Sequence, residues 1–469
     1  MDRINISRKD VVWGYISQVF NIGANLFILP VIFFFLSGDI LGIWYIFINV
    51  GTFATLFGLV FQSTFSRNIA YAFGGATSLK KDDIDIESGI LDEPNIPLVK
   101  GIISAMRRFY GFISIGMLFF LLLFGIPYFY YLSGGLSEQA EIIQAWVVYA
   151  VSIAFSFYCL HFGSILQGRG YVKEFNQLTI LNRFTYIILV YVFVSNGYYI
   201  WGIALANVIS AIVNYISGDL LAYKNKFKSA LKSVETYSGN LLKIIWSNTY
   251  KLTLATLFIF ISTKGNLFYV SLFLPLEIIA KYGLSLQVVN VLTTASLLYF
   301  YSYSPMISQS WVTGNLDIIK RIYTKSLVVA ILTYSVGAIA VVLFGDWGLE
   351  LIRSNTTFLP TIPLILLFAV YLLDVNHSLA LNLLFSHNNV PHLKASIWSA
   401  IAIFILIPVF VVKLDMGILG VIVSVGIVQL CYQNWKWVYV VSHSLKMSLG
   451  EQIVMGVRGL MNIKLKSNA

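Results

Sequence analysis

Long apolar runs recur along the whole chain, and they restrict its fold more than any other feature. The stretch from Leu41 to Ser66 is representative, because it contains no charged residue. About 20 consecutive apolar residues cross the hydrocarbon core of a bilayer as an α-helix. Hydrophobic residues make up 58% of the sequence and charged residues 11%, whereas soluble domains carry roughly 25% charged residues. The sequence therefore predicts an all-α integral membrane protein.

Twelve of these runs are long enough to be spans. The first, from Val11 to Leu36, exceeds the apolar core of a signal peptide, which is about 7–15 residues long, so it is interpreted as a span and not as a cleaved leader. The predicted spans are residues 11–36, 41–66, 109–132, 143–166, 175–195, 200–222, 244–270, 280–303, 326–345, 360–386, 395–412 and 416–440.

The connections between the spans alternate in charge. Lysine and arginine gather at the N-terminus, in residues 67–108 and 223–243, and in every second connection after that, while the intervening connections carry few or none. Basic connections stay on the cytoplasmic side of a membrane. Both termini are therefore predicted to be cytoplasmic. This topology also explains the net charge of +10, so no nucleic-acid partner is expected.

A weak internal repeat accompanies the twelve spans. Three residues of the second span recur in the eighth with one constant offset, and duplicated bundles are common among transporters. The repeated residues are Gly42, Asn49 and Thr52, which correspond to Gly283, Asn290 and Thr293.

The basic linker at residues 223–243 divides the spans six plus six. We predict an N-terminal six-helix lobe at residues 1–222 and a C-terminal six-helix lobe at residues 244–445. Residues 446–469 are predicted to form a cytoplasmic tail.

Several spans contain polar side chains that a helix facing only lipid would not need. We predict that they line a water-filled cavity, although such residues also hydrogen-bond neighbouring helices. In the first span the polar residues share one helical face, because they recur at three- and four-residue intervals. The principal candidates are Gln18, Asn21, Asn25, Asn49 and Asn290, and the second span adds Thr52, Thr55, Gln62, Ser63, Thr64 and Ser66.

One acidic residue lies near the middle of a span. Asp374 sits in the tenth span with His377 three positions later, on the same helical face. Ionisable residues within a bilayer cost roughly 2.5–3.5 kcal/mol each to insert. We interpret the two as candidates for proton or sodium coupling; the alternatives are a buried structural pair and a span whose position places Asp374 nearer the interface.

Five cations are candidates for binding an anionic substrate. Arg183 and Lys251 lie within the fifth and seventh spans, where they could bind a diphosphate or extend to the cytoplasmic surface. Lys264 and Lys281, near outer span ends, could form an exit site or extend to the surface. Arg67 could bind phosphate at a cytoplasmic gate, but a flanking anchor is the favoured interpretation.

Catalytic and cofactor signatures do not stand out. No GxxxxGK[ST] motif occurs, so this chain is not expected to hydrolyse ATP, and no Ser-His-Asp or metal-ligand spacing is apparent. Cys159 and Cys431 lie in apolar runs. The outer connections are too short for a catalytic domain. We therefore expect no enzyme, no metal and no cofactor, with an H⁺ or Na⁺ gradient as the candidate energy source.

Local motifs resemble a known superfamily. The segments Gly42-Ile43-Trp44 and FQSTFSRNIAYAFGGA at residues 61–76, with Gly202 and the GILG motif at residues 417–420, resemble the O-unit (polysaccharide) flippases of the multidrug/oligosaccharidyl-lipid/polysaccharide (MOP) exporter superfamily. The resemblance implies two MATE-like six-helix lobes around a central cavity.

It also implies a function. The chain would move an undecaprenyl-diphosphate-linked oligosaccharide across the bacterial inner membrane by alternating access, for O-antigen in lipopolysaccharide or for another surface polysaccharide. A cationic cavity would neutralise the diphosphate. A polysaccharide polymerase and a chain-length regulator are the expected protein partners.

Other functions stay open. A cation-coupled multidrug antiporter of the same fold would use Asp374 as its coupling acid, but the first span, residues 11–36, has no Asp or Glu. A membrane O-antigen polymerase or glycosyltransferase would need a large outer loop. Twelve spans in place of fourteen argue against the lipid II flippase branch.

Overall fold

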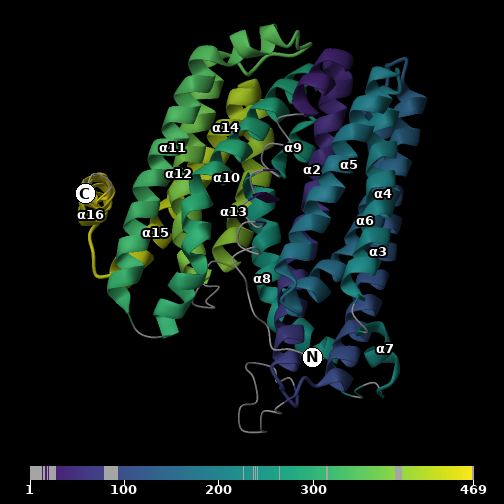
Figure 1. Ribbon diagram of the computed structural model, residues 1–469. Coiled ribbons are helices and arrows are strands. Elements are labelled where there is room, and N and C mark those ends of the chain that lie inside the picture. The colour runs from purple at the N-terminus through teal and green to yellow at the C-terminus, as the bar shows by residue number, and fades with distance from the viewer. Residues whose placement is uncertain are drawn as a thin grey trace. The chain divides into compact units, whose positions relative to one another are not determined.

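A computed structural model describes most of the chain (Figure 1). It covers residues 28–78, 93–224, 227–235, 241–263, 265–312, 315–385 and 393–466, with residues 13, 16, 17, 20, 237 and 239.

The elements of the described residues are all helices. They are α2 (Gly38–Phe73), α3 (Ile96–Leu132), α4 (Gln139–Gly168), α5 (Val172–Ser195), α6 (Tyr199–Ala222), α7 (Phe227–Lys232), α8 (Leu241–Thr263), α9 (Asn266–Val270), α10 (Leu276–Val312), α11 (Leu316–Leu351), α12 (Thr361–Phe385), α13 (Leu393–Pro408), the π-helical turn η2 (Val409–Lys413), α14 (Gly417–Val428), the π-helical turn η3 (Gln429–Gln433), α15 (Asn434–Ser444) and α16 (Leu449–Lys466).

Ten helices of the described residues are long and apolar enough to cross a membrane. They are α2 to α6, α10 to α12, α13 with η2, and the continuous helix formed by α14, η3 and α15. The chain is thus a multi-pass membrane protein. The predicted span 11–36 lies largely outside the described residues, and the predicted span 244–270 is divided between α8 and α9. The count of twelve spans and the cytoplasmic termini stay predictions.

The chain's internal contacts define two compact units. Unit 1 comprises Met1–Leu36 and Phe47–Leu257, and unit 2 comprises Ser37–Ile46 and Phe258–Ala469. The first turns of α2 therefore belong to unit 2 and the remainder to unit 1. The lobe, linker and tail boundaries expected from the sequence stay predictions.

Unit 1 is built around an aromatic core. Helix α4 packs against α3 and α6, and α5 packs against α6. Phe65 of α2, Tyr110 of α3 and Phe157 of α4 are buried together. The rings of Tyr110 and Phe157 lie 5.3 Å apart, and those of Phe65 and Tyr110 lie 5.8 Å apart. Such ring pairs stabilise beyond the area they bury, so three helices are fixed at one level.

A glycine lets α2 and α4 approach closely within this unit. A Cβ atom on Gly163 would lie 2.5 Å from Nε2 of Gln62, and the Ser164 hydroxyl donates to the Gln62 carbonyl at 3.3 Å. Small residues permit such contacts between membrane helices. Gln62 is therefore enclosed between helices. Thr64 is also buried and accepts a hydrogen bond of 3.2 Å from Thr249. Both side chains therefore lie between helices of unit 1, and their cavity-lining role stays a prediction.

Two glycines from the internal repeat meet at one helix crossing in unit 2. A Cβ atom on Gly42 of α2 would lie 2.5 Å from the backbone oxygen of Leu276 in α10. A Cβ atom on Gly283 of α10 would lie 2.5 Å from the ring of Tyr45 in α2. The repeated positions thus form the contact between the helices that carry them.

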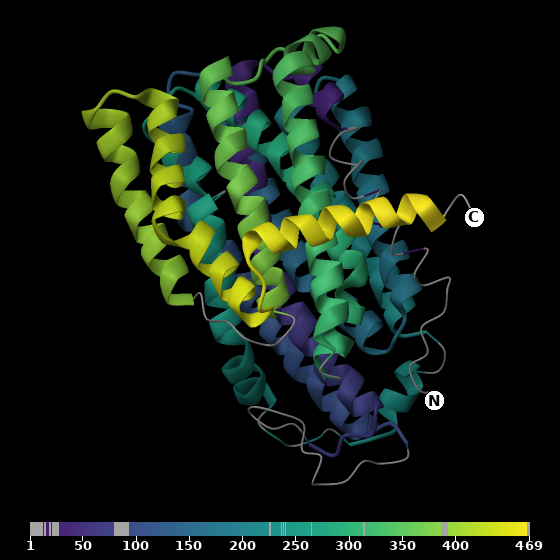
Figure 2. The ribbon, with the colours of Figure 1, turned by 90° about the vertical axis from the view of Figure 1, so that its left-hand side faces the viewer.

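The remainder of unit 2 is arranged around α11. It packs against α10, α12 and α16, and α12 packs against α15. Figure 2 shows α16, the yellow helix at the C-terminus, running transversely across the spans of its own unit. Residues expected to form a tail therefore include a helix docked on α11.

Candidate functional site

Helix α2 presents a polar stripe on one exposed face. Thr52, Thr55 and Ser63 are exposed, as is Arg67 near the predicted cytoplasmic end. Each of the three hydroxyl groups donates 2.9 Å to a carbonyl of its own helix, three or four residues earlier. The stripe is thus satisfied within the helix, and each hydroxyl oxygen can still accept a hydrogen bond.

Arg183 of α5 lies on the exposed surface of unit 1. It is 11 residues into the helix, roughly 16 Å from the end at Val172. Tyr149 of α4 and Tyr186 of α5 lie near its guanidinium. The Tyr149 hydroxyl would lie 2.7 Å from a Cβ atom on Gly51 of α2. This contact places α2, α4 and the cation of α5 in one region of unit 1.

The other predicted cations differ in their surroundings. Lys281 of α10 forms an ion pair of 2.9 Å with Glu277, one turn earlier in the same helix, so part of its charge is already neutralised. Lys251 belongs to α8, but its side chain lies outside the described part of the structure, and Lys264 lies outside it entirely.

The predicted amide residues are only partly described. Gln18, Asn21 and Asn25 lie outside the described residues. Asn49 of α2 and Asn290 of α10 are both half-buried. The side-chain oxygen of Asn290 has no hydrogen-bond partner within the described part of the chain, an arrangement that commonly marks an ordered water.

Asp374 and His377 lie together on α12, as their spacing predicts. Nδ1 of His377 lies 3.4 Å from Oδ1 of Asp374, and the histidine is only 3% exposed. Tyr334 of α11 and Tyr371 of α12 lie near the carboxylate. Nε2 of His377 and the Tyr334 hydroxyl are buried and lack partners among the described residues. The pair therefore has unused donors and acceptors that a water or cation would satisfy.

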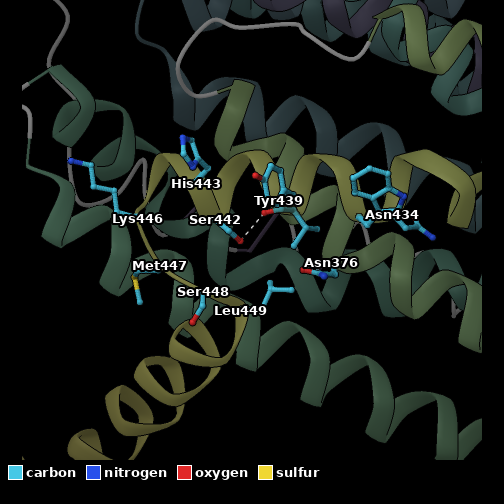
Figure 3. Close-up of a pocket in the computed structure, with 11 residues that line it drawn as sticks. Asn376, Asn434, Tyr439, Ser442, His443, Lys446, Met447, Ser448 and Leu449 are labelled. Atoms are coloured by element: carbon cyan, nitrogen blue, oxygen red, sulfur yellow. Dashed lines mark hydrogen bonds between the residues drawn. The ribbon is translucent and has the colours of Figure 1, made fainter.

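A groove of about 720 Å³ is lined by residues of α12, of α15 and of the turn that leads into α16 (Figure 3). Asn376 belongs to α12, Asn434 and His443 belong to α15, and Lys446 belongs to the turn. Asn376 lies roughly 14 Å from the end of α12 at Phe385, and Asn434 lies roughly 15 Å from the end of α15 at Ser444. Both polar atoms of the Asn434 amide and Oδ1 of Asn376 have no partner in the described chain. The lining is completed by Trp435, Val438, Tyr439, Ser442, Met447, Ser448 and Leu449.

The groove was missed by the sequence analysis, although a signal was present. Gln429, Gln433 and Asn434 gather near the middle of the predicted twelfth span, where polar groups are rare and informative. The π-helical turn η3 ends directly before Asn434, and such turns are frequent at functional sites. Asn376 stands between Asp374 and His377 in the chain, but residues one or two positions apart lie on different faces of a helix, and the lining of the groove includes neither of the pair.

Replacing Asp374 with asparagine is expected to reduce gradient-driven transport at least about tenfold, since a lost charge-assisted contact is worth about 1.5–3 kcal/mol. Asparagine keeps the shape of the side chain but not its charge. Transport by reconstituted protein under an imposed H⁺ or Na⁺ gradient measures the effect. The control is Asp317→Asn, at an exposed position in the first turn of α11. Equal transport by both variants would exclude Asp374 from coupling.

No protein-family model and no curated protein sequence matches the chain. Solved structures do match its fold. One is an inward-facing multidrug resistance MATE family transporter of the MOP superfamily, with a TM-score of 0.65 and 14% identity over 97% of this chain and 96% of that chain. A second is the lipid II flippase MurJ in an inward closed conformation, with a TM-score of 0.62 and 13% identity over 97% and 91%.

A third similar structure is the MATE multidrug transporter DinF-BH, solved as a complex with a ligand. Its TM-score is 0.62, with 14% identity over 95% of each chain. The likeness covers nearly the whole chain, and at this identity it establishes the fold alone. The similar structures are transporters and a flippase. The chain has the fold of the MOP-superfamily transporters.

Proposed function

We propose that the protein is a flippase for undecaprenyl-diphosphate-linked oligosaccharides. It would move them from the cytoplasmic to the outer leaflet of a bacterial inner membrane by alternating access, and so supply O-antigen or another surface polysaccharide. The fold alone does not separate this function from multidrug export, because flippase and multidrug transporter structures resemble the chain about equally. The distribution of charge in unit 1 favours an anionic substrate.

The observation that carries the proposal is an exposed mid-helix cation on unit 1, without an acidic residue at a comparable distance from the ends of α3 to α6. In α3 to α6 the only acidic residues are Glu141, Glu174 and Asp219, each within one turn of a helix end. Arg183, by contrast, lies in the middle of α5.

Lysines neutralise two of these terminal acids. Lys224 lies 2.5 Å from Glu174 and Lys228 lies 4.0 Å from Asp219. The exposed surface around Arg183 is therefore better suited to an anion than to a cationic drug.

The proposed mechanism assigns separate tasks to the polar features. The Arg183 guanidinium would bind the diphosphate through two parallel hydrogen bonds, with Lys251 as a second candidate. The stripe of Thr52, Thr55 and Ser63 would accept hydrogen bonds from sugar hydroxyls. The polyprenyl tail would remain in lipid. Asp374, with His377, would couple the movement to an ion gradient, and a polymerase and a chain-length regulator would receive the product.

A multidrug antiporter is the second candidate. It is favoured by the likeness to MATE multidrug transporters and by the Asp374–His377 pair, which could serve as a coupling site for either function. In that case the protein would confer drug resistance on a sensitive host, and its loss would leave surface polysaccharide unchanged.

Reconstitution tests the proposal directly. Liposomes containing the protein, with a fluorescent lipid-diphosphate-oligosaccharide in one leaflet, should show that lipid in the far leaflet when an H⁺ or Na⁺ gradient is applied. A membrane-impermeant quencher reads the transfer. Liposomes without protein are the control. No transfer under either gradient, together with export of a cationic dye, would refute the flippase and establish the antiporter.

A further inference from the structure

Helix α16 presents an apolar face that no described part of unit 2 covers. Leu449, Ile453, Val457 and Met461 recur at four-residue intervals, and each is 40–63% exposed. Residues at this spacing share one side of a helix. The polar residues Glu451 and Arg458 occupy a different exposed edge. The helix is therefore amphipathic in its solvent-accessible part.

A third face of α16 is fixed to α11. A Cβ atom on Gly456 would lie 2.3 Å from the Thr324 carbonyl oxygen and 2.6 Å from Val328. Gln452 is 0% exposed, and its amide donates to the Ser442 hydroxyl at 2.9 Å and to the Met447 carbonyl at 3.2 Å. These contacts hold the helix rigidly against its unit.

The start of α16 is specified locally as well. The Ser448 backbone N–H donates to the Glu451 carboxylate at 2.7 Å, and the Glu451 N–H donates to the Ser448 hydroxyl at 3.3 Å. This reciprocal capping box satisfies two backbone donors, and hydrogen bonds from Ser448 lower the pKa of the Glu451 carboxyl. Because the capping side chains occupy these donors, the helix start is not itself an anion site.

The charged residues at the start of α11 end at the level where α16 crosses this helix. Before the crossing, α11 carries Asp317, Lys320 and Arg321, and Lys325 lies at the crossing beside Gly459; after it, no charged residue occurs until Asp346. Such a boundary marks the edge of the hydrocarbon core, and under the predicted topology it is the cytoplasmic edge.

The apolar stripe, the polar edge and the face that contacts α11 are arranged as they would be in a helix that lies flat on a membrane. The helix runs transversely to α11 (Figure 2). By helical geometry, the apolar stripe and the edge with Glu451 and Arg458 lie on opposite sides of the face that contacts α11. With α11 crossing the bilayer, one of these edges is directed toward the acyl chains and the other toward the cytoplasm.

We propose that α16 lies in the cytoplasmic membrane–water interface and binds a leaflet rich in anionic phospholipid. Its apolar stripe enters the boundary between headgroups and acyl chains, as interfacial helices do. The cations around it bind phosphate: Lys446 at the turn before α16, Arg458 in the helix, and Lys320, Arg321 and Lys325 on α11. They outnumber the nearby acids Asp317 and Glu451.

The observations favour lipid over a protein partner. The stripe is at the level where the adjacent span enters the membrane, and the charges beside it have the sign that anionic headgroups attract, each worth about 1 kcal/mol near a charged leaflet. This inference does not depend on which substrate the protein moves.

Paired cysteine labels test the placement of α16 in the full-length protein. In a background with Cys159→Ser and Cys431→Ser, Val457→Cys and Arg458→Cys each receive an environment-sensitive fluorophore. The vesicles contain either phosphatidylcholine alone or phosphatidylcholine with phosphatidylglycerol. Quenchers attached near the top of the acyl chains and aqueous iodide then report the surroundings of each label.

The label at position 457 should be quenched by the lipid-attached quencher at least twofold more than the label at position 458, and iodide should show the reverse order. Lipid quenching at position 457 should rise when phosphatidylglycerol is present, and Lys446→Gln with Lys325→Gln should abolish that rise. Equal iodide quenching at both positions would overturn the proposal. Protection of position 457 from both quenchers would also overturn it and would indicate a protein partner.

Discussion

Arg183→Ala is expected to lower the transfer of a lipid-linked diphosphate roughly 10- to 150-fold, because a charge-assisted hydrogen bond contributes about 1.5–3 kcal/mol. The guanidinium lies within α5 on an exposed surface of unit 1, in a region without mid-helix carboxylates. Its removal leaves the diphosphate without a fixed counter-charge. Surface glycan in cells and far-leaflet lipid in liposomes both measure the effect.

Two further variants distinguish diphosphate binding by Arg183 from a general loss of protein integrity. Arg183→Lys keeps the charge but loses the bidentate geometry, so an intermediate rate is expected. Arg108→Ala removes an exposed arginine at the predicted cytoplasmic edge of α3 and should leave transfer unchanged. Wild-type transfer by Arg183→Ala, at normal protein level, would eliminate Arg183 as a diphosphate ligand. Increased export of cationic dye by that variant would favour the antiporter.

Gly42→Ala is expected to produce a large loss of stability for a single-methyl change. The new Cβ atom would lie 2.5 Å from the backbone oxygen of Leu276, and a backbone atom cannot move aside as a flexible side chain can. Inserting a methyl group into such a contact costs about 1–3 kcal/mol. The midpoint of thermal unfolding in detergent, followed by intrinsic fluorescence, should fall by several degrees.

Gly116→Ala is the matched control. Gly116 also lies inside a long helix, α3, but a Cβ atom there would have no heavy atom within 4 Å. Alanine is intrinsically more favourable than glycine in a helix by up to about 1 kcal/mol, so this variant should be unchanged or more stable. Similar losses from both substitutions would mean that the α2–α10 contact does not limit stability.

The helices were largely predictable because a helix buried in lipid requires a long run of apolar residues in the sequence. A membrane helix must satisfy its backbone internally, so uninterrupted apolar runs such as Leu41–Ser66 predict helices reliably. The spacing of Asp374 and His377 likewise predicted their proximity, since residues three apart lie on one helical face.

Relations between distant helices were not predictable from apolarity. Gln62 has the character of a cavity residue, yet Gly163, on another helix, lets it pack between helices. Asn434 became a candidate site residue only when α12 brought Asn376 to the same groove. The pairing of Lys281 with Glu277 could have been anticipated from their four-residue separation.

Helix α16 was not predicted, for a different reason. Glycines and charges lower its average hydropathy, so a search for membrane-spanning segments does not detect it. Its apolar residues recur every four positions, however, and that periodicity is the usual signature of a helix with one apolar face.

The contact between Gly42 and Leu276 has a consequence for the order in which the protein is assembled. The start of α2 is synthesised early, but it belongs to unit 2, whose other residues begin at Phe258. At translation rates of about 5–20 residues per second, roughly 10 to 50 s separate the two sides of this contact. During that interval the glycine-bearing face of α2 lacks the helix that it packs against in the folded protein. A substitution at Gly42 would therefore act late, when the second half of the chain docks, and not during insertion of the first.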